Sequence, residues 1–196
     1  MTHNASLSVK LVRIGAALLV LALASISLTL WITRQLEGGA AAVNEAGRMR
    51  MQTWRLASAV QAERPAPEVQ ALVQQFDDSL GLLREGDATR PLFVPSDVDV
   101  QRELAAVERL WLSQRGLWTL ALPTDDQVLL RSADEFVRAI DRLVLAIEHQ
   151  LAGYTALLNL FQFAMMALAV AGSVVMLYTG YLYVINPLGH LQRGLA

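Results

Sequence analysis

The sequence of 196 residues contains no cysteine and few charged residues. Without a thiol, the chain has no disulfide, no thiolate-bound zinc or iron–sulfur cluster, and no cysteine nucleophile. Charged residues make up 17% of the chain, against about 25% in a typical soluble domain, and 54% of it is hydrophobic. The net charge of −2 argues against nucleic acid, which usually requires a clearly basic face. The composition instead resembles that of membrane proteins.

Residues suited to catalysis are also scarce. The three histidines, His3, His149 and His190, have no partner at the spacing of a metal site or a catalytic pair. The sequence has no glycine-rich phosphate loop and no nucleophile elbow. The adjacent acids Asp77 and Asp78 fit a solvated helix face better than general acid–base catalysis. We therefore expect no catalysis, no cofactor and no metal site in this chain.

Two long apolar runs predict transmembrane helices at 14–33 and 156–185. The 19 residues from Ile14 to Ile32 carry no charge, and no Asp, Glu, Lys or Arg occurs between Glu148 and Arg193. About 20 apolar residues suffice for a helix to cross a bilayer. A cleavable signal peptide, the alternative for the first run, has an apolar region of only about 7–15 residues.

The distribution of charge predicts the topology. Outside 34–148 the only charged residues are Lys10, Arg13 and Arg193, whereas that segment holds thirteen arginines and all eighteen acids, a net of −5. Short basic flanks of membrane helices stay in the cytoplasm. We expect a cytoplasmic tail at 1–13, cytoplasmic termini, and a sensor domain at 34–155 on the outside. That side is the periplasm if the protein belongs to the inner membrane of a Gram-negative bacterium.

The outer segment predicts an all-α fold, an antiparallel four-helix bundle continuous with both transmembrane helices. Apolar residues recur at helical spacing in four stretches joined by short connections, among them Val73, Phe76, Val107, Trp111, Phe136 and Ile140. Pro67 suits the first turn of the second helix. Ser96 is the expected N-cap of the third helix, and Thr124 with Gln127 matches a capping box before the fourth.

Arg50 stands out among the charges of the first outer helix, because no acid occupies a neighbouring position on that helix. Its neighbours one turn away are Ala46, Gly47, Thr53 and Trp54. Arg50 also lies on one helix face with Val43, Gly47 and Trp54, a stripe of the kind that packs against another helix. An arginine in such a place is costly unless a negative group meets it.

Two kinds of negative group would satisfy Arg50. One is a distant acid such as Asp134 or Asp141 on the fourth helix, which the spacing alone favours because buried charges are usually paired within the protein. The other is a small planar oxyanion held between two Arg50 side chains of a two-fold dimer. Gly47, one turn earlier, would allow the anion to approach closely.

The run from Val43 to Leu56 resembles the periplasmic P-box of bacterial nitrate/nitrite sensor histidine kinases of the NarX and NarQ type. The matching residues are Asn44, Ala46, Gly47, Arg50, Met51, Gln52, Arg55 and Leu56. The stretch 136–144 resembles the weaker partner box, and Asn186-Pro187-Leu188 resembles the start of a HAMP linker at 186–196. The resemblance covers essentially the whole chain as a PilJ-type sensor domain with both membrane helices.

This resemblance implies a homodimeric receptor module in the bilayer that binds nitrate or nitrite through Arg50 from each subunit, with backbone contact from Gly47. It also implies a cytoplasmic histidine kinase module in the full-length receptor, whose catalytic part is absent here. Arg48, Met49 and Trp54 depart from the family pattern, and Arg48 has Glu45 at the spacing of a routine surface pair. Two alternatives remain: the sensor of a methyl-accepting chemotaxis-type receptor for another small ligand, and a ligand-free structural bundle.

Overall fold

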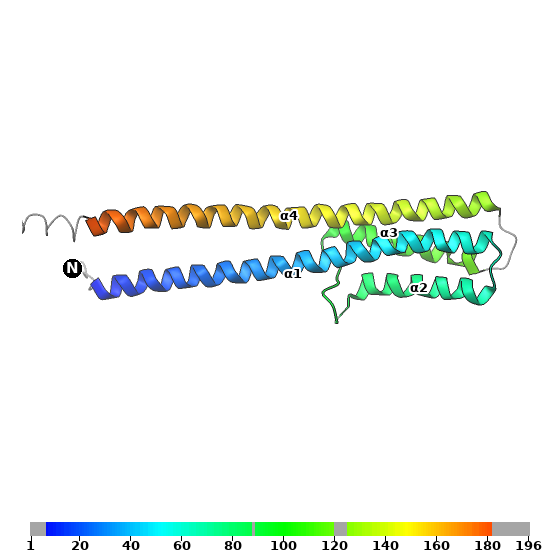
Figure 1. The fold of residues 1–196 in the computed structure, drawn as a ribbon, viewed down its shortest axis with the longest axis horizontal. Coiled ribbons are helices and arrows are strands. Elements are labelled where there is room, and N and C mark those ends of the chain that lie inside the picture. Colours follow the sequence, from blue (N-terminus) through cyan, green and yellow to red (C-terminus); the bar gives the residue numbers. More distant parts are fainter. Residues whose placement is uncertain (1–6, 88, 120–124, 182–196) are drawn as a thin grey trace, which may run out of the picture. The chain divides into compact units, whose positions relative to one another are not determined.

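The computed structural model describes residues 7–87, 89–119 and 125–181, and these form four α-helices. Helix α1 spans Leu7–Gln61, α2 spans Ala66–Glu85, α3 spans Val98–Thr119, and α4 spans Asp126–Gly180 (Figure 1). The only pairing of β type in the described part is an isolated bridge between Asp87 and Leu92. The all-α fold is confirmed. The expected HAMP start at 186–196 lies outside the described residues, as do His3, His190 and Thr124.

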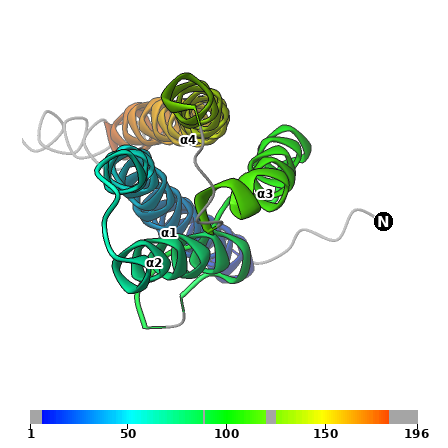
Figure 2. The ribbon, with the colours of Figure 1, turned by 90° about the vertical axis from the view of Figure 1, so that its right-hand side faces the viewer.

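The chain divides into two compact units, residues 1–154 and residues 155–196. The first unit contains α1, α2, α3 and the first part of α4. These helices alternate in direction along the chain (Figure 1) and surround one core (Figure 2). The described part of the second unit is the remainder of α4, whose side chains are almost all exposed.

An aromatic cluster joins three of the helices at the centre of the bundle. Phe76 of α2 stacks on Trp111 of α3 with ring centroids 4.1 Å apart, and Phe136 of α4 meets both rings edge-on at 4.9 and 5.9 Å. All three side chains are at most 2% exposed. Burial of each large apolar side chain contributes about 1.5–3 kcal/mol to folding. The helical periodicity predicted these positions, together with Val73, Val107 and Ile140, which are also buried.

Two adjacent glycines of α1 allow close packing against two different segments. A Cβ at Gly38 would lie 2.1 Å from the Phe93 ring, which belongs to the loop between α2 and α3. A Cβ at Gly39 would lie 2.5 Å from a methyl group of Leu151 on α4. The missing side chains thus bring the loop and α4 directly against the backbone of α1.

Aspartates form the N-caps of α3 and α4, one residue after the hydroxyl residues that the sequence suggested. The Asp97 carboxylate accepts the Asp99 N–H at 2.9 Å, and the Asp125 carboxylate accepts the Gln127 N–H at 3.0 Å. The prediction of Ser96 as the N-cap is wrong, since α3 begins only at Val98. In both loops a carboxylate, an equally good or better cap, lies one residue nearer the helix.

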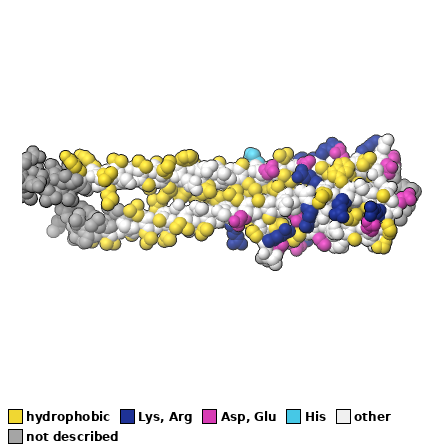
Figure 3. Space-filling model, viewed as in Figure 1, with side chains coloured by type: hydrophobic (Ala, Val, Ile, Leu, Met, Phe, Trp, Pro, Cys, Tyr) yellow, Lys and Arg dark blue, Asp and Glu magenta, His cyan; other side chains and the backbone are white. Residues whose placement is uncertain are grey.

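Helices α1 and α4 are long and apolar enough to cross a membrane. The core helix of a soluble protein would bury its most apolar stretch. Here only 6% of that stretch of α1, and none of that of α4, is buried within the structure. Charged side chains gather instead over the part of the first unit where α2 and α3 lie (Figure 3). Exposed apolar surface of this extent is typical of helices that can cross a lipid bilayer.

Candidate anion-binding site

The structure places Arg50 opposite Asp141, one of the two acids that the sequence had offered as partners. Arg50 Nη1 donates to Asp141 Oδ1 at 2.8 Å and so joins α1 to α4. Asp134, the other candidate, pairs with Arg138 on its own helix. Both side chains of the Arg50–Asp141 pair are 43% exposed. The pair is therefore in contact with solvent, not sealed in the core.

Gly47 lies directly beneath the free edge of this guanidinium. A Cβ added at Gly47 would lie 3.6 Å from Arg50 Nη2. Within the described part of the chain, Nη2 has no hydrogen-bond partner. Gly47 and Arg50 are thus adjacent in space. The Nη2 group of Arg50, which has no partner among the described residues, lies over Gly47, where no side chain is present.

The motif that carries Arg50 divides into a core face and a surface face. Ala46, Gln52 and Leu56 are at most 6% exposed and pack inside the bundle. Arg50 is half-exposed, whereas Met51 and Arg55 are exposed. The motif therefore combines residues that hold α1 in the bundle with residues that solvent can reach.

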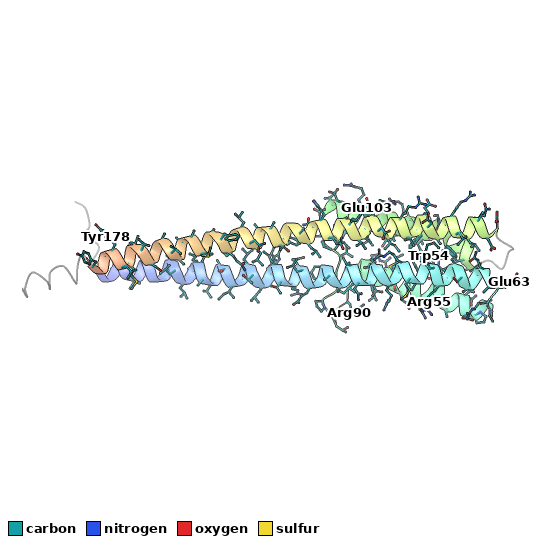
Figure 4. All side chains as sticks on the ribbon, turned by 45° about the horizontal axis from the view of Figure 1, so that its top comes forward. Trp54, Arg55, Glu63, Arg90, Glu103 and Tyr178 are labelled. Atoms are coloured by element: carbon teal, nitrogen blue, oxygen red, sulfur yellow. The ribbon has the colours of Figure 1, made fainter. Side chains whose placement is uncertain are left out.

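Two residues that depart from the family pattern have different environments. Met49 is fully buried in the core, whereas Trp54 is 44% exposed. The stripe that includes Trp54 does not pack fully against another helix of this chain, contrary to the expectation from its spacing. Grooves of about 260 and 570 Å³ lie beside it between α1 and α2, and both are lined by Met51 and Arg55. Figure 4 labels Trp54 and Arg55 on α1.

A second charged cluster surrounds Glu45, five residues before Arg50. Its carboxylate is only 3% exposed, and it accepts from Arg48 Nη2 at 2.6 Å and from Arg90 Nη2 at 3.3 Å. Arg90 also donates to Asp87 at 2.9 Å, and Arg48 donates to Ser79 on α2 at 3.3 Å. The predicted Glu45–Arg48 pair forms, but it is not a routine surface pair, because the Glu45 side chain is buried and shared with Arg90 of a distant loop.

Sequence reasoning could not find the second arginine of this cluster. Arg90 is 45 residues from Glu45 and belongs to the α2–α3 loop (Figure 4). The only signal in the sequence was the local spacing of Glu45 and Arg48. We call Glu45, Arg48, Arg90 and Asp87 the Glu45 cluster.

Asp77 is another acid whose role the sequence did not reveal. We expected Asp77 and Asp78 to lie on a solvated face. Instead Asp77 accepts from the Trp111 indole at 2.6 Å and from Arg115 Nη2 at 2.8 Å, and so joins α2 to α3. The Asp77 carboxylate holds the pKa of Arg115 above its usual value. This contact is structural, and no group of three or more His, Asp or Glu among the described residues is arranged to bind a metal.

A helical bundle built on two helices able to cross a membrane is typical of receptor input domains. Residues 31–136 match the model of the PilJ family, described as the N-terminal domain of the type IV pili methyl-accepting chemotaxis transducer. The chain belongs to this family and is a sensor module with two helices that could cross a membrane. No curated protein matches the chain. The matched region contains Gly47, Arg50 and the Glu45 cluster, and it ends before Asp141.

Proposed function

We propose that this chain is the input module of an inner-membrane receptor that binds nitrate or nitrite at the interface of a homodimer. Arg50 from each subunit holds the anion, and Gly47 provides the space for it. The sensor domain is 34–155, on the periplasmic side, between transmembrane helices at 14–33 and 156–185. The tail at 1–13 and the HAMP start at 186–196 are cytoplasmic and lead to a histidine kinase module. The observation that carries this proposal is the half-exposed Arg50 guanidinium over Gly47, within a motif that resembles the P-box.

The chemistry of the site suits a small planar anion. A guanidinium presents parallel N–H groups that match two oxygens of a planar oxyanion. Two such groups facing each other across a dimer repel, and one anion between them removes the repulsion. Because Nη2 has no partner in the described residues, this edge of Arg50 is available without breaking the core.

The two long helices provide the route for the signal. Helices α1 and α4 each run without interruption for 55 residues, from the bundle into an apolar stretch. Arg50 belongs to α1 and its partner Asp141 to α4. An anion that changes this contact therefore acts on both helices that lead to the cytoplasm, as helix shifts do in other receptors.

Thermal unfolding of the full chain in detergent tests the proposal. Sodium nitrate is compared with sodium chloride at equal ionic strength, for the parent, Arg50→Ala and the control Arg64→Ala. Arg64 forms an ion pair of similar exposure with Glu68, so its removal changes the charge equally. Ligand at about 100 times Kd stabilises the folded state by about 2.7 kcal/mol. We expect this stabilisation in the parent and in Arg64→Ala, and its loss in Arg50→Ala.

Two results would overturn nitrate binding at Arg50. One is a parent that millimolar nitrate does not stabilise. The other is a nitrate-dependent stabilisation that Arg50→Ala retains. If Arg50→Ala unfolds far more readily than Arg64→Ala without nitrate, the ligand-free structural bundle becomes the better account, because the Arg50–Asp141 pair would then be essential to the fold.

The family match favours a second candidate, the sensor of a chemotaxis-type receptor for another small ligand. The PilJ description names a methyl-accepting chemotaxis transducer. The residues encoded after 196 distinguish the two outputs. A histidine kinase dimerisation domain there favours the kinase, and a long coiled coil favours the chemotaxis receptor.

A further inference from the structure

We infer that Asp141 is an internal counter-ion of Arg50, which a bound oxyanion displaces. This inference rests on the proposed function, since it concerns how the same site is regulated. In the absence of anion, the Asp141 carboxylate occupies Arg50 and joins α4 to α1 at 2.8 Å. Binding of the anion breaks that link in the same step.

The exposure of the pair makes such an exchange feasible. Arg50 and Asp141 are each 43% exposed, and only one guanidinium N–H and one carboxylate oxygen take part in their contact. An ion can therefore reach the pair from solvent without opening the bundle. By contrast, a buried and fully bonded pair resists exchange because its charges cannot be rehydrated.

Nitrate and the Asp141 carboxylate compete for Nη1 of Arg50, because an anion that binds through two oxygens needs this donor together with the free Nη2. A carboxylate and a nitrate are both planar groups of charge −1 that accept hydrogen bonds through two oxygens. A guanidinium binds either of them along one edge. Asp141 has the advantage of being attached to the chain, which gives it a high effective concentration beside Arg50. Free anion therefore has to overcome this internal competitor, which lowers its apparent affinity.

The released carboxylate has another partner close by. Arg138 lies three residues before Asp141 on α4, at the spacing of a helical ion pair. Its side chain is 66% exposed and pairs with Asp134. Displaced Asp141 can share this arginine or return to water, so release leaves no buried charge unpaired.

The exchange links anion binding to the connection between the two signalling helices. Coupling of this kind is reciprocal. If the anion weakens the α1–α4 link, then a substitution that removes the link must strengthen anion binding by the same factor. A half-exposed ion pair is worth about 0.2–1 kcal/mol. The expected gain in affinity without Asp141 is therefore about 1.4- to fivefold.

Nitrate titration of the full chain in detergent tests the inference, with Asp141→Asn compared with Asp134→Asn. The control removes the same charge two helical turns away and leaves the Arg50 contact intact. We expect nitrate to bind Asp141→Asn about 1.4- to fivefold more tightly than the parent, and the gain in Asp134→Asn to be clearly smaller than that in Asp141→Asn. Equal gains in the two variants would indicate only a long-range effect of charge and would overturn the counter-ion role.

The remaining outcomes separate the inference from the proposed function. If the parent binds nitrate and Asp141→Asn binds it no better, Asp141 is not a competitor, although Arg50 remains the anion site. If neither protein binds nitrate, both proposals fail.

A distance measurement tests the displacement itself. Because the chain has no cysteine, nitroxide labels attach only at Ser58→Cys on α1 and Leu130→Cys on α4, both exposed positions. Labelled chains are diluted with unlabelled chains so that only distances within one chain are measured. We expect nitrate to change the distance distribution, and Asp141→Asn to reproduce that change without nitrate. A nitrate-dependent change that Asp141→Asn does not reproduce would overturn displacement.

Discussion

Two charged clusters lie five residues apart on α1, and they differ in how far water can reach them. The Glu45 carboxylate is 3% exposed and bonds to two arginines from different parts of the chain. Asp141, which pairs with Arg50, is 43% exposed and forms one contact with it. The first cluster contains a buried charge that needs permanent partners, whereas the second contains charges that water or another ion can satisfy.

This difference in exposure indicates that Glu45 and Arg50, which belong to one motif, have different roles. A buried charge stripped of its partners is costly, so the Glu45 cluster fixes the α2–α3 loop against α1. A half-exposed ion pair contributes little to stability and exchanges easily. The predictions below test whether the Glu45 cluster is structural and whether the Arg50 site is open to a ligand.

The largest expected effect comes from removing both arginines of the Glu45 cluster. Arg48→Met with Arg90→Met leaves the Glu45 carboxylate buried without a cation, which costs about 3–5 kcal/mol of folding free energy. Thermal unfolding of the full chain in detergent measures the loss. Arg102→Met, which breaks an exposed pair with Asp99, is the control and should cost less than about 1 kcal/mol. A double variant as stable as this control would show that the cluster is not structural.

The next largest effect comes from the contact between Gly38 of α1 and Phe93, which holds the α2–α3 loop and its Arg90 against α1. In Gly38→Ala the new Cβ meets the Phe93 ring at 2.1 Å, so the ring and its loop must move. Overpacking of this kind typically costs about 1–3 kcal/mol. Gly81→Ala is the matched control, because nothing lies within 4 Å of its added Cβ. We expect thermal unfolding to show destabilisation for Gly38→Ala and slight stabilisation for Gly81→Ala. A change in stability of the same sign in both variants would contradict close packing of Phe93 against Gly38.

The sequence predicted the helices well because their signals are local. Positions such as Phe76, Val107 and Ile140 recur at helical spacing, and all are buried as expected. The N-caps were placed one residue early, because a hydroxyl residue and an aspartate stand side by side in both loops. Either residue type can cap a helix, and the choice depends on where the chain turns.

The partners of the charged clusters could be predicted only in part, because some of them are distant in the sequence. Spacing along α1 shows that Arg50 has no local acid, and Asp141 was one of two acids that could reach it. The burial of Glu45 depends on Arg90, which reaches it only after the chain has reversed direction and α2 has run back along α1. No local pattern contains that information.

Gly47→Ala tests whether the Arg50 site has space reserved for a ligand. The added Cβ makes an ordinary contact at 3.6 Å with Nη2, and alanine in a helix interior is favoured over glycine by about 1 kcal/mol. We expect the thermal stability to rise slightly while the affinity for nitrate falls by about tenfold, equivalent to about 1.4 kcal/mol. Gly116→Ala on α3, whose added Cβ has no neighbour within 4 Å, should stabilise without changing affinity. Unchanged nitrate affinity in Gly47→Ala would exclude an anion over Gly47.

The smallest expected effect is a pH dependence at the exposed side of the Glu45 cluster. The Thr89 hydroxyl, the Thr89 backbone N–H and Arg90 stabilise the Asp87 carboxylate and lower its pKa from the ordinary value of 3.8. A lowered pKa in the folded state adds stability above the unfolded-state pKa. That stability is lost as the pH falls through the folded-state pKa. Thr89→Val removes the hydroxyl donor, so the parent should unfold at a higher temperature near pH 5, and this difference should shrink as the pH approaches about 3. A difference that does not change with pH would mean that Thr89 acts through packing and not through the Asp87 carboxylate that helps to hold Arg90.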